Sequence, residues 1–139
     1  PDPSRRVLGV DLGERRIGLA VSDPTGSVAR PLRVLERSGP RAADRRAILS
    51  AATEVAAGRI VVGLPRSMSG SEGPAARAVR EEVEALQSEA GPIEVTVHDE
   101  RLTTVMARRV QPRRRQRRRE PVDDLAAALI LQSYLDSHS

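Results

Sequence analysis

An unbroken run of apolar residues near the middle of the chain limits the folds that this sequence can adopt. The run occupies residues 59–64 and reads Arg-Ile-Val-Val-Gly-Leu, so that no polar side chain follows the arginine. Strands of this kind are typically buried on both faces, which requires helices to cover both sides of the sheet. Segments with helical periodicity flank the run at 41–57 and 74–90. The pattern therefore predicts an α/β fold.

The order of the other segments predicts how the sheet is built. Three short apolar runs separated by turn signals are typical of a meander, and they lie at 5–11, 17–22 and 28–35. Pro31 should place the third strand at a sheet edge or at a bulge. Alternating apolar and polar residues predict a fifth strand at 93–98. The result is a five-stranded mixed sheet, in which a three-strand meander is followed by βα units and helices flank the sheet.

The C-terminal third of the chain is expected to contain two more helices around a basic loop. The expected elements are a short helix at 102–110, the loop at 111–121 and a final helix at 122–135. Leu125, Leu129 and Leu135 are predicted to form the apolar side of that final helix. The sequence shows no internal repeat and no domain boundary, so residues 1–139 are interpreted as a single domain.

Positive charge is concentrated in one segment. All 23 basic residues are arginines, and nine of them lie at 101–119, where there is no acid. This segment carries +9, which leaves the rest of the chain with a net charge of −5. Such asymmetry favours a nucleic acid as partner, while a single aromatic residue argues against a platform that stacks bases. The absence of Cys excludes thiolate chemistry, and no apolar run approaches the length of a membrane span.

Acidic residues follow two of the predicted strands and begin the last helix. Asp11 ends the first strand, Asp99 and Glu100 end the fifth, and the final helix opens with Asp123 and Asp124. If the first and fifth strands are parallel, their carboxyl ends share one edge of the sheet. Clustered carboxylates without His or Cys suit Mg²⁺ or Mn²⁺. Helix capping and ordinary turn chemistry are the simpler alternatives.

Four blocks of sequence, in this order, closely resemble the YqgF/RuvX family. They are Val10-Asp11-Leu12-Gly13-Glu14-Arg15-Arg16-Ile17-Gly18, Val61-Val62-Gly63-Leu64-Pro65 through Met68-Ser69-Gly70, Asp99-Glu100-Arg101-Leu102-Thr103-Thr104, and Val122-Asp123-Asp124-Leu125-Ala126-Ala127 through Ile130-Leu131-Gln132. The resemblance implies a ribonuclease H-like fold and a cytoplasmic, metal-dependent nuclease. Members of the family are assigned either to 5′-end processing of pre-16S ribosomal RNA or to resolution of Holliday junctions.

The resemblance also implies which acids are catalytic and bind the metal. Asp11, Glu100 and Asp123 match the family's acids, with Asp99 and Asp124 as second choices. In related junction resolvases the middle acid comes from the strand beside the first. The corresponding strand here, at 60–64, carries no acid.

Two loops are the candidate contacts to nucleic acid. The residues expected to bind phosphates are Arg101, Arg113, Arg114, Arg115, Arg117, Arg118, Arg119 and Ser69. The arginine run could equally be a solvated loop, and the loop at 65–73 a plain connection capped by Ser71. His98 is interpreted as a surface residue.

Other classes of function remain open at this point. Asp11-Leu12-Gly13 on a hairpin also resembles the first phosphate loop of actin-like ATPases and sugar kinases, but 139 residues leave no room for their second lobe. A non-catalytic nucleic-acid-binding scaffold is the third possibility, favoured if the acids lie too far apart. Structured RNA and branched DNA are both possible substrates, and the chain could be a monomer or a homodimer.

Overall fold

The computed structural model describes residues 6–66, 71–100 and 122–138, with side chains in the last range described from residue 125. Its five strands form one sheet in the order β3-β2-β1-β4-β5. The strands are β1 (Val7–Leu12), β2 (Arg16–Ser22), β3 (Ala29–Glu36), β4 (Arg59–Leu64) and β5 (Glu94–Asp99). The helices are α1 (Arg41–Glu54), α2 (Pro74–Glu89) and α4 (Val122–Ser137). The predicted α/β fold is confirmed, and the expected helix at 102–110 and basic loop at 111–121 lie outside the described residues.

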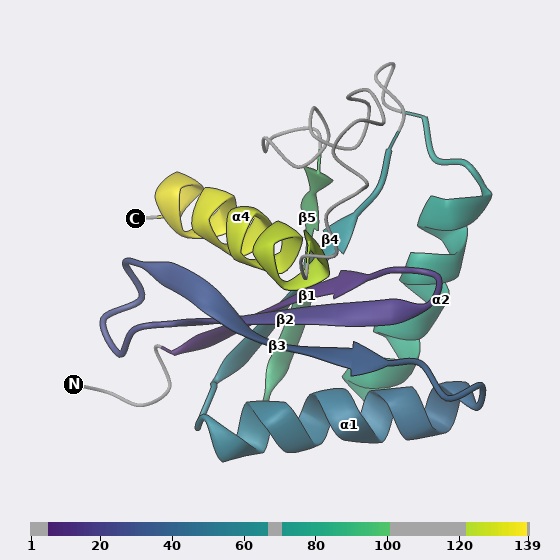
Figure 1. Cartoon of the computed structure of the whole chain (residues 1–139), viewed down its shortest axis with the longest axis horizontal. Helices are drawn as coiled ribbons and strands as arrows, with labels where there is room; N and C mark the ends of the chain where they lie inside the picture. Colours follow the sequence, from purple (N-terminus) through teal and green to yellow (C-terminus); the bar gives the residue numbers. More distant parts are fainter. Residues whose placement is uncertain (1–5, 67–70, 101–121, 139) are drawn as a thin grey trace.

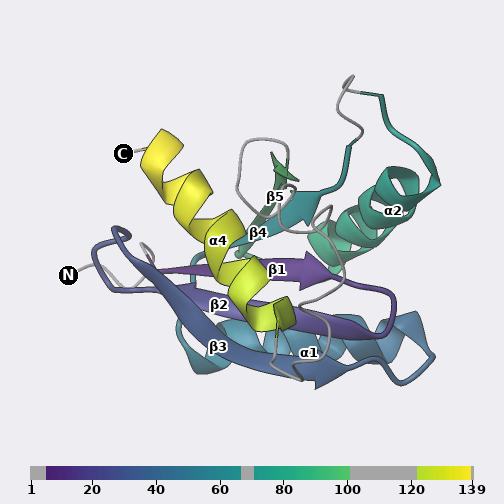
Figure 2. The same cartoon turned by 45° about the horizontal axis from the view of Figure 1, so that its top comes forward.

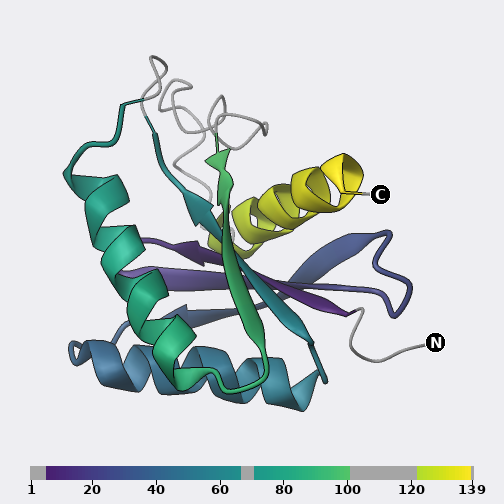
Figure 3. The same ribbon diagram turned by 180° about the vertical axis from the view of Figure 1, so that it is seen from behind.

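Helices cover both faces of the sheet, as the buried central strand requires. In Figure 1 the yellow helix α4 lies on one side of the strands, with α1 and α2 on the other. Figure 2 shows α4 crossing over β1, β2 and β3, and Figure 3 shows α1 and α2 from behind. An apolar cluster that includes Leu8, Val62 and Leu86 fills the layer between the sheet and α1 and α2. A second cluster, which includes Val61 and Leu131, lies between the sheet and α4. In the described parts of the chain, no helix is long and apolar enough to cross a membrane.

Strand directions bring three carboxyl ends to one edge of the sheet. β1 pairs with β2, and β2 with β3, in antiparallel register, which is the predicted meander. β4 pairs in parallel with β1 on one side and with β5 on the other. β1, β4 and β5 therefore all run the same way. Pro31 lies in the edge strand β3, at the register shift opposite Leu19 and Ala20, as its missing N–H predicts.

The packing of α4 agrees with the prediction only in part. Leu135 is buried and Leu129 partly buried, as expected, but Leu125 is 37% exposed. The buried side chains of α4 also include Ala127, Ile130 and Leu131. A methyl group at Gly9 of β1 would lie 2.8 Å from Cβ of Leu131 and 3.2 Å from the carbonyl oxygen of Ala127. Small residues on both elements therefore let the helix backbone approach the sheet directly. The spacing of the leucines alone therefore did not identify the face of α4 that packs on the sheet.

The start of α2 also corrects an expectation. The helix begins at Pro74, and its N-cap is Gly73, which makes no side-chain capping hydrogen bond. Ser71 therefore does not hold the N-cap position that the plain-loop interpretation gave it. Proline at the first helical position needs no N–H partner, which explains why this start is stable without a side-chain cap.

The β2–β3 turn contains an acid with a strongly shifted pKa. The carboxylate of Asp23 accepts hydrogen bonds from Oγ1 of Thr25 at 2.6 Å and from the backbone N–H groups of Ser27 and Val28 at 2.8 and 3.0 Å. These bonds, with that of Thr25 the strongest, lower the pKa of Asp23 from 3.8 to about 2. The turn therefore depends on the ionised form.

We expect the contribution of Asp23 to stability to be complete above pH 4 and to be lost as the pH falls towards 2. The sign follows because the folded pKa lies below the unfolded one, so that the unfolded chain binds the proton more readily. Carboxyl chemical shifts followed by NMR should report a pKa of about 2. Thr25→Val should raise that pKa towards its ordinary value. An unchanged pKa in this variant would show that the hydroxyl is not the main cause.

Candidate active site

Asp11 lies at the carboxyl end of β1 and is buried, with 2% of its surface exposed. Side chains alternate along a strand, so Asp11 shares a face with Gly9, which contacts α4. Val10 pairs with Val62 of β4, so that Asp11 and Gly63 lie at the same level on neighbouring parallel strands. Neighbouring strands are roughly 4.8 Å apart. The Asp11 carboxylate is thus held on the α4 face of the sheet, beside the end of β4.

Glu100 reaches the same place from β5. It follows the last residue of β5 and is also 2% exposed. A methyl group at Gly63 would lie 3.1 Å from Oε2 and 3.3 Å from Cγ of Glu100. The Glu100 side chain therefore extends over β4, on the α4 face, next to the position of Asp11. Although β4 carries no acid, a carboxylate lies over its end.

Asp99 takes a different direction from its neighbour. It pairs in register with Leu64 and lies on the same face of β5 as Val95 and Val97, which pack into the core between the sheet and α1 and α2. Its carboxylate lies 3.5 Å from Nη1 of Arg66. Asp99 is consequently on the side of β5 away from Asp11, whereas Glu100 lies on the same side as Asp11.

The third predicted acid lies in the first turn of α4. Asp123 and Asp124 belong to the helix by their backbone, but their side chains lie outside the described residues. Asp123 precedes Ala127 by four residues, which is about one helical turn, and Ala127 contacts β1 beside Gly9. Among the residues whose side chains are described, no group of three or more His, Cys, Asp or Glu side chains could hold a metal ion.

His98 is not the surface residue that the sequence suggested. It is 6% exposed, and its Nε2 lies 2.9 Å from Oγ of Ser133 in α4. Its ring meets that of Tyr134 edge-on, with centroids 5.9 Å apart. Burial is the main cause that lowers the pKa of His98, aided by the nearby His138. The histidine thus links β5 to α4 two residues before Glu100.

A buried ion-pair network holds the turn that follows Asp11. Arg37 donates from Nη1 to the carbonyl oxygen of Gly13 at 2.6 Å, and from Nη2 to both carboxylate oxygens of Glu82 at 2.7 and 2.8 Å. Its Nε donates to Asp44 at 3.1 Å. One guanidinium therefore joins the β1–β2 turn to α1 and α2. Sequence reasoning missed Arg37, because nothing in its neighbourhood distinguishes it from the other arginines.

The residues predicted to contact phosphates belong to two loops, of which only the loop at 65–73 is partly described. Ser69 and the arginines of the basic segment lie outside the described residues; the arginines are Arg101, Arg113, Arg114, Arg115, Arg117, Arg118 and Arg119. Within the described part of the loop at 65–73, Arg66 and Arg80 both pair with Glu72. These contacts join the described ends of this loop to α2 and, through Arg66, to Asp99.

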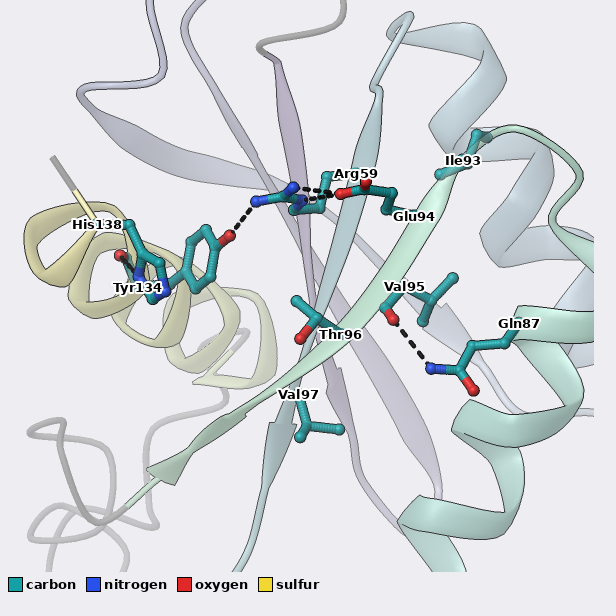
Figure 4. Close-up of a pocket in the computed structure, with 9 residues that line it drawn as sticks. All are labelled: Arg59, Gln87, Ile93, Glu94, Val95, Thr96, Val97, Tyr134 and His138. Atoms are coloured by element: carbon teal, nitrogen blue, oxygen red, sulfur yellow. Dashed lines mark hydrogen bonds and ion pairs between the residues drawn. The ribbon is translucent and has the colours of Figure 1, made fainter.

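A separate open pocket lies near the beginnings of β4 and β5. Its volume is about 530 Å³, and its wall includes Arg59, Glu94, Tyr134 and His138. Figure 4 shows Arg59 between Glu94 and the hydroxyl of Tyr134, bonded to both. The positive charge of Arg59 is therefore matched by a carboxylate within the pocket. Asp11, Asp99 and Glu100, the predicted site residues whose side chains are described, do not line it.

The fold and the paired carboxylates define a class of protein. The structure is similar to that of RuvC from Thermus thermophilus, solved in complex with a Holliday junction substrate, with a TM-score of 0.58 and 16% identity, covering 95% of this chain and 94% of that one. This likeness shows a ribonuclease H-like fold. The model of the RuvX family, described as Holliday junction resolvase, matches residues 5–137, and the chain belongs to that family.

Curated relatives agree with this assignment over nearly their whole length. A protein of Thermoanaerobacter pseudethanolicus is 43% identical over 136 residues, which cover 95% of this chain and 96% of the relative. One from Moorella thermoacetica is 46% identical over 134 residues, covering 94% of each chain. Both are described as "Putative pre-16S rRNA nuclease".

Proposed function

We propose that this protein is a metal-dependent nuclease whose active site contains Asp11, Glu100 and Asp123. The observation that supports the proposal is that two buried carboxylates, Asp11 and Glu100, lie on one face of the sheet at the ends of their strands. They come from strands β1 and β5, which are separated by β4. Two carboxylates held close together repel each other, and a bound cation offsets this repulsion. Family membership supports a nuclease in particular.

The donor set fits a hard divalent cation. Asp11 and Glu100 supply carboxylate oxygens, and their surroundings on the α4 face contribute no thiolate, so Mg²⁺ or Mn²⁺ is the expected ion. We expect Asp11 and Glu100 to hold it, with Asp123 as the third ligand. When bound, such an ion activates water and offsets the charge that develops on the phosphate. The chain's own contribution is to fix the two carboxylates rigidly and exclude bulk water from them.

The preferred substrate is structured RNA, with processing of the 5′ end of pre-16S ribosomal RNA as the activity. The support is that relatives sharing 43% and 46% of their residues with this chain carry that description. Resolution of Holliday junctions is the second candidate, supported by the description of the family model. An RNA precursor as substrate implies a cytoplasmic enzyme that can act as a monomer. A junction requires two active sites related by symmetry, and hence a dimer.

Cleavage assays with two labelled substrates test the proposal. One is an RNA that spans the 5′ leader of pre-16S ribosomal RNA, and the other is a mobile four-way DNA junction, each incubated with Mn²⁺. Cuts confined to the RNA support the preferred activity, and paired nicks in the junction support the second. If both are bound and neither is cut, the protein is a non-catalytic scaffold and the proposal is wrong.

Binding to either substrate should weaken steeply with salt. The run at 113–119 contains six arginines, and each phosphate that an arginine neutralises releases condensed counterions. With about four contacts, affinity should fall roughly 50- to 150-fold between 50 and 200 mM salt. Fluorescence anisotropy with the Asp11→Asn variant, which is expected not to cleave the substrate, measures this salt dependence of the affinity directly. If the logarithm of the affinity hardly changes with the logarithm of the salt concentration, the arginine run does not contact the nucleic acid.

A further inference from the structure

At Gly63, side chains from α4 and from the end of β5 both lie close to β4. A methyl group at this position would lie 2.5 Å from Cδ1 of Ile130, and 3.1 and 3.3 Å from Oε2 and Cγ of Glu100. Ile130 and Glu100 are both buried, at 0% and 2% exposure. The space above Gly63 is therefore filled by two neighbouring side chains.

One of these neighbours is a candidate active-site acid. Glu100 follows β5, so its side chain has to extend sideways over β4 to approach Asp11. Only a residue without a side chain at position 63 leaves this path open. The position is level with Asp11 on the adjoining strand, because Val62 pairs with Val10. A side chain at residue 63 and that of Glu100 would compete for one place beside Asp11.

We propose that Gly63 is a positioning residue, whose missing side chain reserves the place beside Asp11 for the Glu100 carboxylate. Residues 63 and 100 are accordingly alternative sources of one carboxylate, because a side chain grown from either would end in the same space. This inference rests on the proposed function for its catalytic meaning, although the sharing of space is independent of it.

Gly9 provides a matched control. It lies on the same face, and a methyl group there would also crowd α4, at 2.8 Å from Cβ of Leu131. Among the nearest atoms to that methyl group, all belong to α4 and none to Glu100. Gly9→Ala thus disturbs helix packing to a similar degree without touching the acid.

The sharing of space is tested by thermal unfolding without added metal. The background is Ile130→Val, which removes the Cδ1 atom nearest to Gly63. In this background, Gly63→Ala should lower the Tm by about 4 °C when Glu100 is present. It should lower the Tm by clearly less when Glu100 is replaced by Ala, because two groups in contact are not additive. Equal shifts in the two backgrounds would overturn the proposal.

The exchange of carboxylates is tested by titration with Mn²⁺, followed by the loss of its free electron paramagnetic resonance signal. Glu100→Ala in the Ile130→Val background should weaken binding by at least tenfold. Adding Gly63→Asp should restore most of that loss, while Gly63→Asn, of the same shape but without charge, should not. Gly9→Ala should change the affinity less than threefold. Where Glu100→Ala does weaken binding, equal affinities for the Asp and Asn variants would also overturn the proposal.

The same experiments separate this inference from the proposed function. If Asp11→Asn and Glu100→Ala leave Mn²⁺ binding unchanged, the proposed metal site is wrong, and the unfolding comparison still decides whether residues 63 and 100 share one space. If the carboxylate can be exchanged but the wild-type protein cuts neither substrate, the nuclease is wrong and the role of Gly63 stands.

Discussion

Replacing Asp11 by Asn is expected to lower the rate of substrate cleavage by about 10³-fold while leaving nucleic-acid affinity within threefold of wild type. Loss of metal-based stabilisation of the transition state amounts to several kcal/mol, and each 1.36 kcal/mol is a factor of ten in rate. The substitution keeps the shape of a side chain that is 2% exposed and removes only its charge. Glu100→Gln is expected to have an effect of similar size.

Single-turnover rates in Mn²⁺, with binding measured separately, check this prediction. Asp99→Asn is the matched control, since it removes the neighbouring acid, which pairs with Arg66 on the other side of β5. It should reduce the rate by less than tenfold. If Asp99→Asn lowered the cleavage rate as much as Glu100→Gln, the interpretation that Glu100 and not Asp99 faces the active site would be wrong. Retained cleavage by the Asp11→Asn protein would refute the proposed active site itself.

The fold was predictable because its strands have unambiguous patterns. The continuous run at 59–64 could only be a central strand, and it pairs on both sides as β4. The meander followed from turn signals, of which the Asp23 turn has the hydrogen bonds that its sequence favours. The apolar face of α4 was predicted less well, because alanines at a close helix–sheet contact are as important there as leucines. Leu125 is partly exposed for that reason.

The candidate site could be predicted only in part. The position of Asp11 at a strand end, and its shared edge with Glu100, followed from the order of the elements. The order of the elements did not decide whether Asp99 or Glu100 is the active-site acid, because that depends on which face of β5 each side chain occupies. A glycine inside a buried strand was a usable signal of close approach by another group. His98 was misplaced, because its partners Ser133 and Tyr134 are 35 and 36 residues away in sequence.

Replacing Arg37 by Met is expected to destabilise the protein by about 3–5 kcal/mol. The side chains of Arg37, Asp44 and Glu82 are only 8%, 4% and 11% exposed, so the variant leaves two carboxylates buried without their shared cation. The carbonyl oxygen of Gly13, two residues after Asp11, loses the guanidinium donor as well. Urea denaturation, analysed for both midpoint and slope, gives the change in unfolding free energy.

Arg33→Met is the matched control for this prediction, because Arg33 lies in β3, the strand that ends one residue before Arg37. Arg33 pairs with Glu54 at 2.9 Å, but the two side chains are 41% and 57% exposed, so the loss should be about 1 kcal/mol or less. Adding Asp44→Asn and Glu82→Gln to Arg37→Met should recover part of the lost stability, because the buried charges are then removed. A loss for Arg37→Met no larger than for Arg33→Met would mean that solvent and Arg41, which lies 3.4 Å from Glu82, compensate the two acids without Arg37. The turn after Asp11 would then be held by its backbone alone, through the 2.9 Å hydrogen bond from Gly13 N–H to the carbonyl oxygen of Arg16.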